Sequence, residues 1–430
     1  MTTAAVPRPS LLRTMGRWSL TAAVVNGVIG SGIFGLPSAV TALAGAWSPA
    51  LVLLAGACIL VVILCFAEVG SRFDEAGGPY LYTRTAFGPA IGFHVGWLLL
   101  AGRLLSAAAA LNILVAYLGP LFPPAATGSG RAAVMVIAMS IVTAINVRGV
   151  QTAAWATNGF TIAKLLPLLL LIGLGLFAIR ADVIATQLVP NPDWREAMLL
   201  LVFAYGGFEA TIIAASESKD PKRDTPFALL TALVAVTIIY CLLQLVVIGV
   251  LPNAASTSTP IAAGLGQLLG PAGVTIGSIA VILSVYGWLT GFTLMMPRVL
   301  YSMAGRGELP AALATVHPRF RTPHVAVLVN AAVALAMGLV SSFGQAAALA
   351  AIARLVIFVA TCAALIALRR SGAPRAGFHV PAGEWVAAAG IAFSVWLLST
   401  RTLPQIGLLA AAIVIGAVVR AAYRPREVQA

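Results

Sequence analysis

Four charged side chains stand inside long apolar stretches of the sequence, where a charge is costly. They are Arg103, Lys164, Glu209 and Arg354. A charged residue near the centre of a membrane helix costs about 2.5–3.5 kcal/mol on insertion scales, so each of the four invites a functional interpretation. The chemistry open to them is ion pairing, binding of a carboxylate and, for the lysine and the glutamate, exchange of a proton.

Two glycine-rich stretches also lie inside apolar runs. They are Gly30-Ser31-Gly32-Ile33-Phe34-Gly35 and Ala204-Tyr205-Gly206-Gly207-Phe208-Glu209. Glycine weakens a helix by about 1 kcal/mol per residue, and unwound backbone at membrane depth is tolerated only where it lines a cavity or is buried in protein. Interrupted helices at matching positions of two repeats point to a transporter's binding site. The alternative is that these glycines only allow close helix packing.

The elements that position these residues are expected to be membrane helices. Of the 430 residues, 60% are hydrophobic and 9% are charged, whereas a soluble domain carries roughly 25% charged residues. Apolar runs of roughly 18–25 residues, each long enough to cross the bilayer, recur from end to end. We predict about twelve spans, at residues 17–43, 49–70, 92–119, 131–148, 155–178, 195–216, 227–250, 272–300, 323–341, 346–369, 383–400 and 403–422.

The distribution of basic residues predicts the orientation of these spans. The net charge is +13, but the charge does not indicate a nucleic-acid partner. With the N-terminus inside, 19 of the 26 Lys and Arg residues fall on the cytoplasmic side and four on the opposite side, as the positive-inside rule requires. We expect an inner (plasma) membrane protein with both termini in the cytoplasm, whose bilayer partners include anionic lipids.

Four motifs in order resemble the amino acid–polyamine–organocation superfamily, and within it the amino-acid permease type. They are Asn26-Gly27-Val28-Ile29-Gly30-Ser31-Gly32-Ile33-Phe34; Glu68 with Gly77-Gly78-Pro79-Tyr80; Phe203-Ala204-Tyr205-Gly206-Gly207-Phe208-Glu209 with the loop after it; and Arg298-Val299-Leu300-Tyr301 with Gly307-Glu308-Leu309-Pro310. The resemblance implies an all-α, leucine-transporter-type fold of 12 transmembrane helices, with two five-helix inverted repeats and broken helices 1 and 6. The implied segments are a cytoplasmic tail (1–16), helices 1–5 (17–178), helices 6–10 (195–369), helices 11–12 (383–422) and a second tail (423–430).

The resemblance also implies a way to bind substrate. Backbone N–H groups at the unwound part of helix 1 suit an α-carboxylate, and freed carbonyls of helix 6 suit an α-ammonium. The amides are those of Ser31, Gly32 and Ile33, and the carbonyls are those of Phe203, Ala204 and Gly206. Phe203 would be an aromatic lid over the substrate, and Phe292 a second aromatic wall.

Coupling is expected to involve Lys164 and Glu209. In sodium-independent relatives a lysine at the matching place stands where sodium-coupled members bind an ion, and Lys164 would reach carbonyls of Asn26 and Ile29. Lys164 either replaces the sodium permanently, titrates during transport, or snorkels to the cytoplasmic surface. For Glu209 a structural or gating role is favoured over direct substrate contact.

The sequence leaves the roles of two arginines open. Arg103, where the best-known members carry a small residue, either binds a second carboxylate of the substrate, pairs with Glu209, or lines a watery vestibule. Arg354 is either a residue of an external gate or a side chain that snorkels to the surface.

These features predict a sodium-independent secondary transporter of amino acids, coupled to protons or working as an exchanger. The alternative is a carrier for a polyamine or another organic amine. A membrane sensor or scaffold would need a large soluble signalling domain, and a membrane enzyme would need a nucleophile motif or clustered histidines, neither of which the sequence contains. No metal or organic cofactor is expected. Substrate identity, stoichiometry and oligomeric state stay open.

Overall fold

The computed structural model describes residues 15–73, 77–148, 165–212, 218–371 and 376–423. In these ranges the chain is built from helices and forms no β-sheet. The helices that matter below are α1 (Arg17–Val28), α2 (Gly32–Ala44), α3 (Ser48–Gly70), α4 (Gly78–Phe87), α5 (Pro89–Leu118), α6 (Gly128–Arg148), α9 (Trp194–Tyr205), α10 (Phe208–Thr211), α11 (Pro221–Val250), α12 (Pro260–Leu269), α13 (Pro271–Gly305), α14 (His324–Val340), α15 (Phe343–Arg370), α16 (Gly383–Ser399) and α17 (Leu403–Ala422).

Seven helical stretches among the described residues are long and apolar enough to cross a membrane. They are Gly32–Gly70, Pro89–Leu118, Gly128–Arg148, Pro221–Val250, Pro271–Gly305, Phe343–Arg370 and Leu403–Ala422. Shorter apolar helices lie at Leu165–Gly175, Pro260–Leu269, His324–Val340 and Gly383–Ser399. The chain is thus a multi-pass membrane protein, and the predicted spans 155–178 and 195–216 lie partly outside the described residues.

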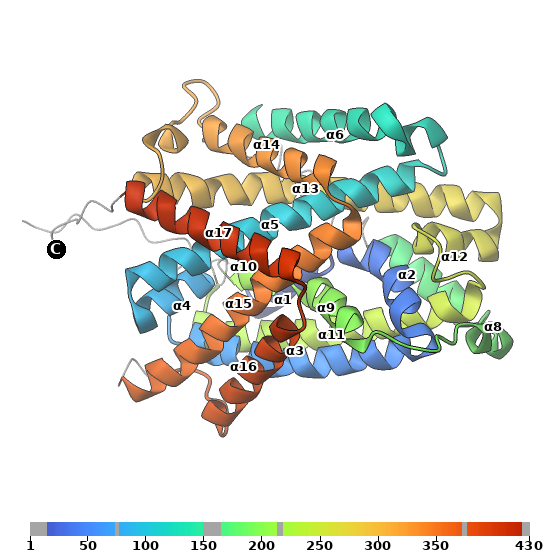
Figure 1. The fold of residues 1–430 in the computed structure, drawn as a ribbon, viewed down its shortest axis with the longest axis horizontal. Helices are drawn as coiled ribbons and strands as arrows, with labels where there is room; N and C mark the ends of the chain where they lie inside the picture. The colour runs from blue at the N-terminus through green and yellow to red at the C-terminus, as the bar shows by residue number, and fades with distance from the viewer. Residues whose placement is uncertain (1–14, 74–76, 149–164, 213–217, 372–375, 424–430) are drawn as a thin grey trace, which may run out of the picture.

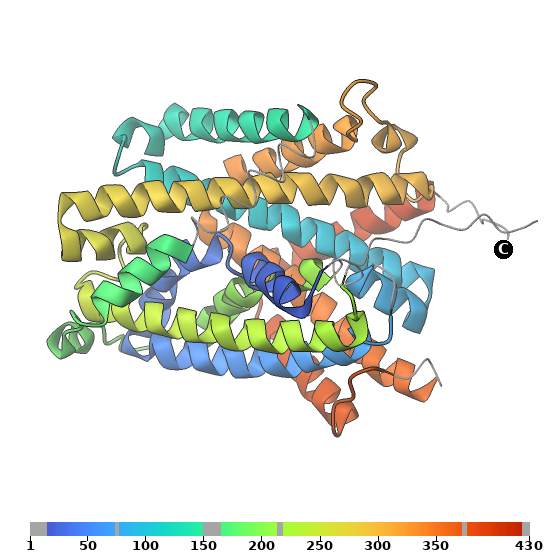
Figure 2. The same ribbon diagram turned by 180° about the vertical axis from the view of Figure 1, so that it is seen from behind.

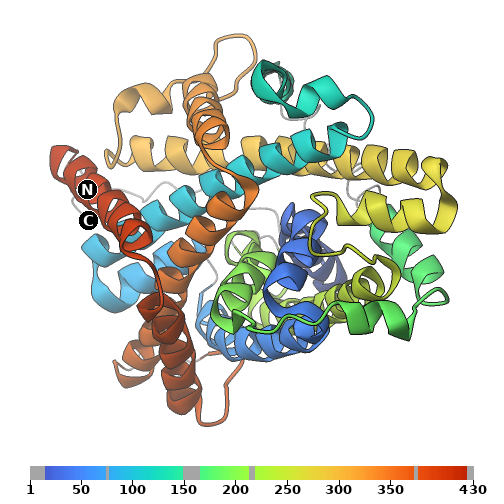
Figure 3. The same ribbon diagram turned by 45° about the vertical axis from the view of Figure 1, so that its right-hand side comes forward.

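Short helices occupy the middle of the molecule, between longer ones. Figures 1 and 2 show α1, α2, α9 and α10 between a group that includes α5 and α13 and a group formed by α3 and α11. In Figure 3, α2 and α9 lie next to each other in the centre, and they are in contact, as are α1 and α11. Helix α15 packs on α5, on α3 and on α9, so it contacts both groups and the centre.

The helix boundaries have local causes. Several long helices begin with proline, which fits the first turn because its missing N–H would have no intrahelical acceptor there; these are α5, α11, α12 and α13. Helix α15 begins with a capping box, in which Ser342 and Gln345 satisfy each other's backbone N–H groups.

Two of the four sequence motifs meet at one end of the molecule. Helix α4 begins within the Gly77-Gly78-Pro79-Tyr80 motif, and its Tyr80 hydroxyl donates to Glu308 Oε1, just after α13, at 3.1 Å. Arg84 donates to the same hydroxyl at 2.6 Å and lies 3.7 Å from the Glu308 carboxylate. The contact ties α4 to the end of α13 across more than two hundred residues of sequence.

Candidate functional site

Both glycine-rich stretches interrupt their helices, and the two interruptions touch. The first separates α1 from α2 at residues 29–31, and the second separates α9 from α10 at Gly206 and Gly207. Gly207 has a φ of +121°, which strongly favours glycine, and a Cβ there would overlap the Gly27 carbonyl oxygen. A Cβ on Gly27 would in turn overlap the Thr211 side chain. These glycines therefore serve close packing as well as the two breaks.

The first turn of α2 presents its amides at this junction. Ser31 is the residue before the helix, and Gly32 and Ile33 are its first residues. The first N–H groups of a helix have no intrahelical acceptor, and they carry the positive end of the helix dipole. Ser31 and Ile33 are buried, and the ring of Phe203 lies 3.2 Å from where a Cβ of Gly32 would stand. The predicted lid therefore does lie beside the predicted amides.

Two of the three carbonyls predicted to receive an ammonium group have protein donors in this conformation. Arg354 Nη1 donates to the Phe203 carbonyl oxygen at 3.1 Å. The Tyr240 hydroxyl lies 3.0 Å from the Ala204 carbonyl oxygen and 3.3 Å from that of Val28. Gly206, the third member, has extended backbone. The Phe203 oxygen also accepts from the Gly206 N–H, so a substrate ammonium would have to displace a donor there, whereas a carbonyl with one donor, such as that of Ala204, has a second lone pair.

A buried ion pair holds the second break. Arg354 Nε donates to Glu209 Oε1 at 2.8 Å, and the Gly207 N–H donates to Glu209 Oε2 at 2.7 Å. The exposed fractions of the arginine and glutamate side chains are 4% and 1%. A Cβ on Gly206 would overlap the Arg354 guanidinium, so the glycine makes room for the pair.

Arg354 connects α15 to three other helices and does not reach the surface. From α15 it contacts Glu209 and Phe203, and its Nη2 lies 3.1 Å from Ser106 Oγ on α5. Of the alternatives for this residue, snorkelling is wrong, because the guanidinium finds enough acceptors inside the protein. Pairing of Glu209 with an arginine does occur, but its hydrogen-bonded partner is Arg354 and not Arg103.

Arg103 stands beside this pair in the middle of α5. Its guanidinium carbon lies 5.3 Å from the ring centroid of Trp288 on α13, within the range of a cation–π contact. Trp288 stacks on Phe292 at 5.7 Å with an interplanar angle of 4°. Arg103 Nε is buried and, across the described part of the chain, has no hydrogen-bond partner.

A small cavity lies where these groups converge. It is bordered by residues of both breaks and by Arg103, Ser106, Phe203, Trp288 and Arg354, and its volume is about 10 Å³, close to the space that one water molecule needs. Phe292 stands behind Trp288 and is not part of this lining. The conformation is therefore closed around its centre, and an amino acid would fit only after the walls move apart.

The predicted coupling residues are only partly described. Lys164 lies outside the described residues. Asn26 and Ile29 lie at the end of α1, where the helix gives way to the first break, and Ile29 is fully buried. Glu209 faces the cavity-lining Arg354 from α10, as described above.

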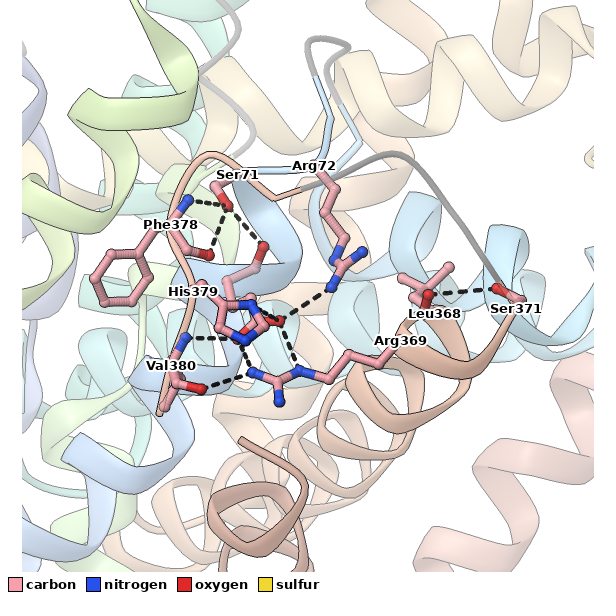
Figure 4. A network of polar contacts seen from close by, with 9 residues as sticks. Ser71, Arg72, Leu368, Arg369, Ser371, Phe378, His379 and Val380 are labelled. Atoms are coloured by element: carbon pink, nitrogen blue, oxygen red, sulfur yellow. Dashed lines mark hydrogen bonds and ion pairs between the residues drawn. The ribbon is translucent and has the colours of Figure 1, made fainter. Parts of the chain in front are cut away.

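A second buried carboxylate, Glu68, forms a different kind of cluster at the end of α3 (Figure 4). It accepts hydrogen bonds from Arg369 Nε at 2.8 Å, from Arg72 Nη2 at 3.0 Å and from the Val380 N–H at 2.8 Å. Ser71 and Phe378 add a further contact, the Phe378 N–H donating to Ser71 Oγ at 3.1 Å. This cluster joins α3, the end of α15 and the segment before α16.

Two touching helix breaks around a charged, closed cavity, inside a multi-pass membrane protein, define a membrane transporter of the broken-helix class. The chain belongs to the amino acid permease family, whose model matches residues 15–418. It is 29% identical to the serine/threonine exchanger SteT of Bacillus subtilis, over 91% of this chain and 92% of that protein. It is 28% identical to the branched-chain amino acid permease BcaP of the same organism, over 90% and 88%. The human large neutral amino acids transporter small subunit 2 is 30% identical, over 74% and 63%. All three are transporters, and the protein is not an enzyme.

Sequence reasoning missed two residues of the cavity wall, Trp288 and Ser106. Trp288 lies one helical turn before Phe292 on the same face of α13, so a helical pattern alone does not tell which of the two reaches the centre. Ser106 lies three residues after Arg103 on α5, and that spacing on a membrane helix is the signal that could have found it.

Proposed function

We propose that the protein is a sodium-independent secondary transporter of amino acids, coupled to an inward proton gradient or exchanging one amino acid for another. The observation that supports this most is the junction of the two helix breaks, with the first turn of α2 facing a cavity. Helix N-termini attract carboxylates, and the backbone of the second break offers carbonyl acceptors for an ammonium group. The amino-acid transport named for SteT, BcaP and the human relative agrees with this substrate.

The proposal includes a topology. Twelve membrane spans are arranged as two five-helix inverted repeats, residues 17–178 and 195–369, followed by two further helices at 383–422. The tails 1–16 and 423–430 face the cytoplasm. The excess of Lys and Arg in alternate loops supports this orientation.

The proposal assigns a role to each of the candidate residues. Ser31, Gly32 and Ile33 receive the α-carboxylate, and the carbonyls near Phe203, Ala204 and Gly206 receive the ammonium. Phe203 closes over the substrate, and Phe292 supports the aromatic wall from behind Trp288. Lys164, with the carbonyls of Asn26 and Ile29, takes the place that a sodium ion holds in sodium-coupled carriers, and Glu209 holds the second break in position.

Uptake into proteoliposomes tests the proposal. Radiolabelled serine, leucine, aspartate and glutamate are offered with and without an inward proton gradient, and with choline in place of sodium. We expect saturable uptake that does not need sodium and that either rises with the gradient or requires amino acid inside the vesicle. Lys164→Ala should change this dependence; unchanged, still pH-dependent uptake by that variant would remove the role of Lys164. No uptake of any amino acid, with putrescine or spermidine transported instead, would replace the proposal by the organic-amine alternative.

A further inference from the structure

The charges around the cavity do not balance. Among the residues described at the cavity, Arg103 and Arg354 are positive, and Glu209 is the carboxylate that faces them. Each of the three guanidinium nitrogens of Arg354 donates a hydrogen bond, to Glu209, to the Phe203 carbonyl and to Ser106. One positive charge, that of Arg103, is therefore left over.

Arg103 is held in position by an aromatic ring, but its buried Nε donor has no hydrogen-bond acceptor among the described residues. The face of Trp288 supports its guanidinium, whose five N–H groups have a fixed fork geometry that matches a carboxylate. Its Nε is buried and, among the described residues, without an acceptor. A buried donor without a partner carries a desolvation cost, and native proteins keep such groups mainly where a ligand or an ion completes them.

The two aromatic rings contact different residues of the first break, and Arg103 borders the same cavity as that break. Trp288, whose ring face contacts Arg103, lies against Gly30, and its Nε1 is 3.2 Å from where a Cβ of Gly30 would stand. Phe203 lies against Gly32. An amino acid whose α-carboxylate sits on the first turn of α2, beside Phe203, would extend its side chain toward the other edge of the break. That edge is the one occupied by Trp288 and Arg103.

We propose that Arg103 is a specificity-determining residue that binds a carboxylate on the substrate's side chain, so that the protein transports acidic amino acids such as aspartate or glutamate. This inference rests on the proposed function, because it assumes an amino acid in the cavity between the breaks. A side-chain carboxylate would neutralise the surplus charge and supply the acceptor that Arg103 lacks. The same surplus charge opposes diamines and polyamines, which bring more positive charge into a buried site.

The test compares uptake of labelled L-glutamate, L-aspartate and L-serine into proteoliposomes. Wild-type protein should take up at least one acidic amino acid in preference to serine. Arg103→Gln should lower the ratio of acidic to neutral uptake by about tenfold or more, since a hydrogen-bonded charge pair contributes at least that much. Arg103→Lys, which keeps the charge but loses the fork, should lower the ratio less. The control is Arg180→Gln, because Arg180 is an exposed arginine paired only with exposed Asp182 in the described structure, and its uptake ratio should match the wild type.

Each other outcome points to a different failure. Serine uptake by the wild type without competition from aspartate or glutamate overturns this inference and leaves the proposed function intact. An equal loss of acidic and neutral uptake in Arg103→Gln shows that Arg103 binds the α-carboxylate, which also overturns it. No uptake of any amino acid by the wild type overturns the proposed function as well. If Arg103→Gln does not fold, two other measurements decide. They are the competition of aspartate and glutamate with serine uptake by the wild type, and the ratio of acidic to neutral uptake by Arg103→Lys.

Discussion

Glu68 and Glu209 are both buried carboxylates that accept hydrogen bonds from arginines, and their clusters differ in whether every nearby arginine is bonded to the carboxylate. Glu68, at the end of α3, accepts from Arg369, Arg72 and the Val380 N–H. Glu209, in the middle of the molecule, accepts from Arg354 and the Gly207 N–H. In the first cluster both arginines bind the carboxylate directly, whereas in the second Arg103 stands nearby without a hydrogen bond in the described structure.

This difference agrees with the proposal that the Glu68 cluster stabilises the fold and the Glu209 cluster borders a binding site. A carboxylate surrounded by bound donors fixes the elements that supply them, here α3, α15 and the segment before α16. A cluster that keeps an unmatched charge beside a cavity has capacity for a ligand. Both clusters draw an arginine from α15: Arg354 and Arg369 are fifteen residues apart, or about 22 Å along the helix. Helix α15 therefore supplies an arginine to each of the two clusters, at positions far apart along its length.

The largest effect is expected for Glu209→Gln. It leaves the Arg354 guanidinium buried without its counter-charge, and breaking a buried ion pair in this way costs about 3–5 kcal/mol. Uptake per molecule and the melting temperature of the purified protein should both fall sharply. The double variant Glu209→Gln, Arg354→Gln should regain part of the stability but not the uptake. A single variant as stable as Glu384→Gln, which alters an exposed carboxylate, would contradict the structural role of the pair.

Gly206→Ala should have the next largest effect. The new Cβ would overlap the Arg354 guanidinium, and overpacking of this kind costs about 1–3 kcal/mol. Uptake should fall because Arg354 would have to leave Phe203 and Glu209. Gly344→Ala is the matched control, because a Cβ there meets no atom within 4 Å. Equal melting temperatures and equal uptake for the two variants would show that the close approach at Gly206 is unimportant.

Glu68→Gln should affect stability more than transport. It weakens the bonds to Arg369 and Arg72, whose side chains are 15% and 6% exposed, and we expect a loss of about 1–3 kcal/mol in unfolding free energy. Arg369→Gln should behave alike, while its neighbour Arg370→Gln, in an exposed pair with Glu384, should change nothing measurable. Uptake normalised to folded protein should stay near the wild-type value. Loss of uptake in a stable, folded Glu68→Gln protein would contradict the assignment of different roles to the two clusters.

The smallest effect is expected at the start of the helix that joins both clusters. Ser342→Ala removes one half of the capping box of α15, which costs about 1 kcal/mol. Thermal unfolding in detergent should show a modest decrease. A transport defect larger than the stability loss would indicate that the position of this helix end controls the cavity.

The sequence predicted the breaks and most helix ends because both depend on local properties. Hydropathy placed spans at 323–341 and 403–422, and the structure has α14 at His324–Val340 and α17 at Leu403–Ala422. The glycines at the two breaks were equally visible, since glycine has the same backbone freedom in any context.

The pairing of charges depends on tertiary contacts, and the sequence left it open. Glu209 and Arg354 are 145 residues apart, and hydropathy does not show which face of α15 meets α10. The prediction of Phe292 as the second aromatic wall missed Trp288 for a similar reason. The two residues share one helix face, and the rotation of α13 against α5 decides which lines the cavity.

The most direct measurement of the central claim, that an amino acid binds between the two helix breaks, is the melting temperature of the purified protein with each amino acid added in turn. Gly30→Leu fills the cavity, because Gly30 lines it next to Trp288, and Gly344→Leu is the control at an open position. We predict that at least one amino acid stabilises the wild type and Gly344→Leu, by about 2.7 kcal/mol at a hundredfold excess over its Kd, and does not stabilise Gly30→Leu. Equal stabilisation of Gly30→Leu by the same amino acid would place the binding site elsewhere.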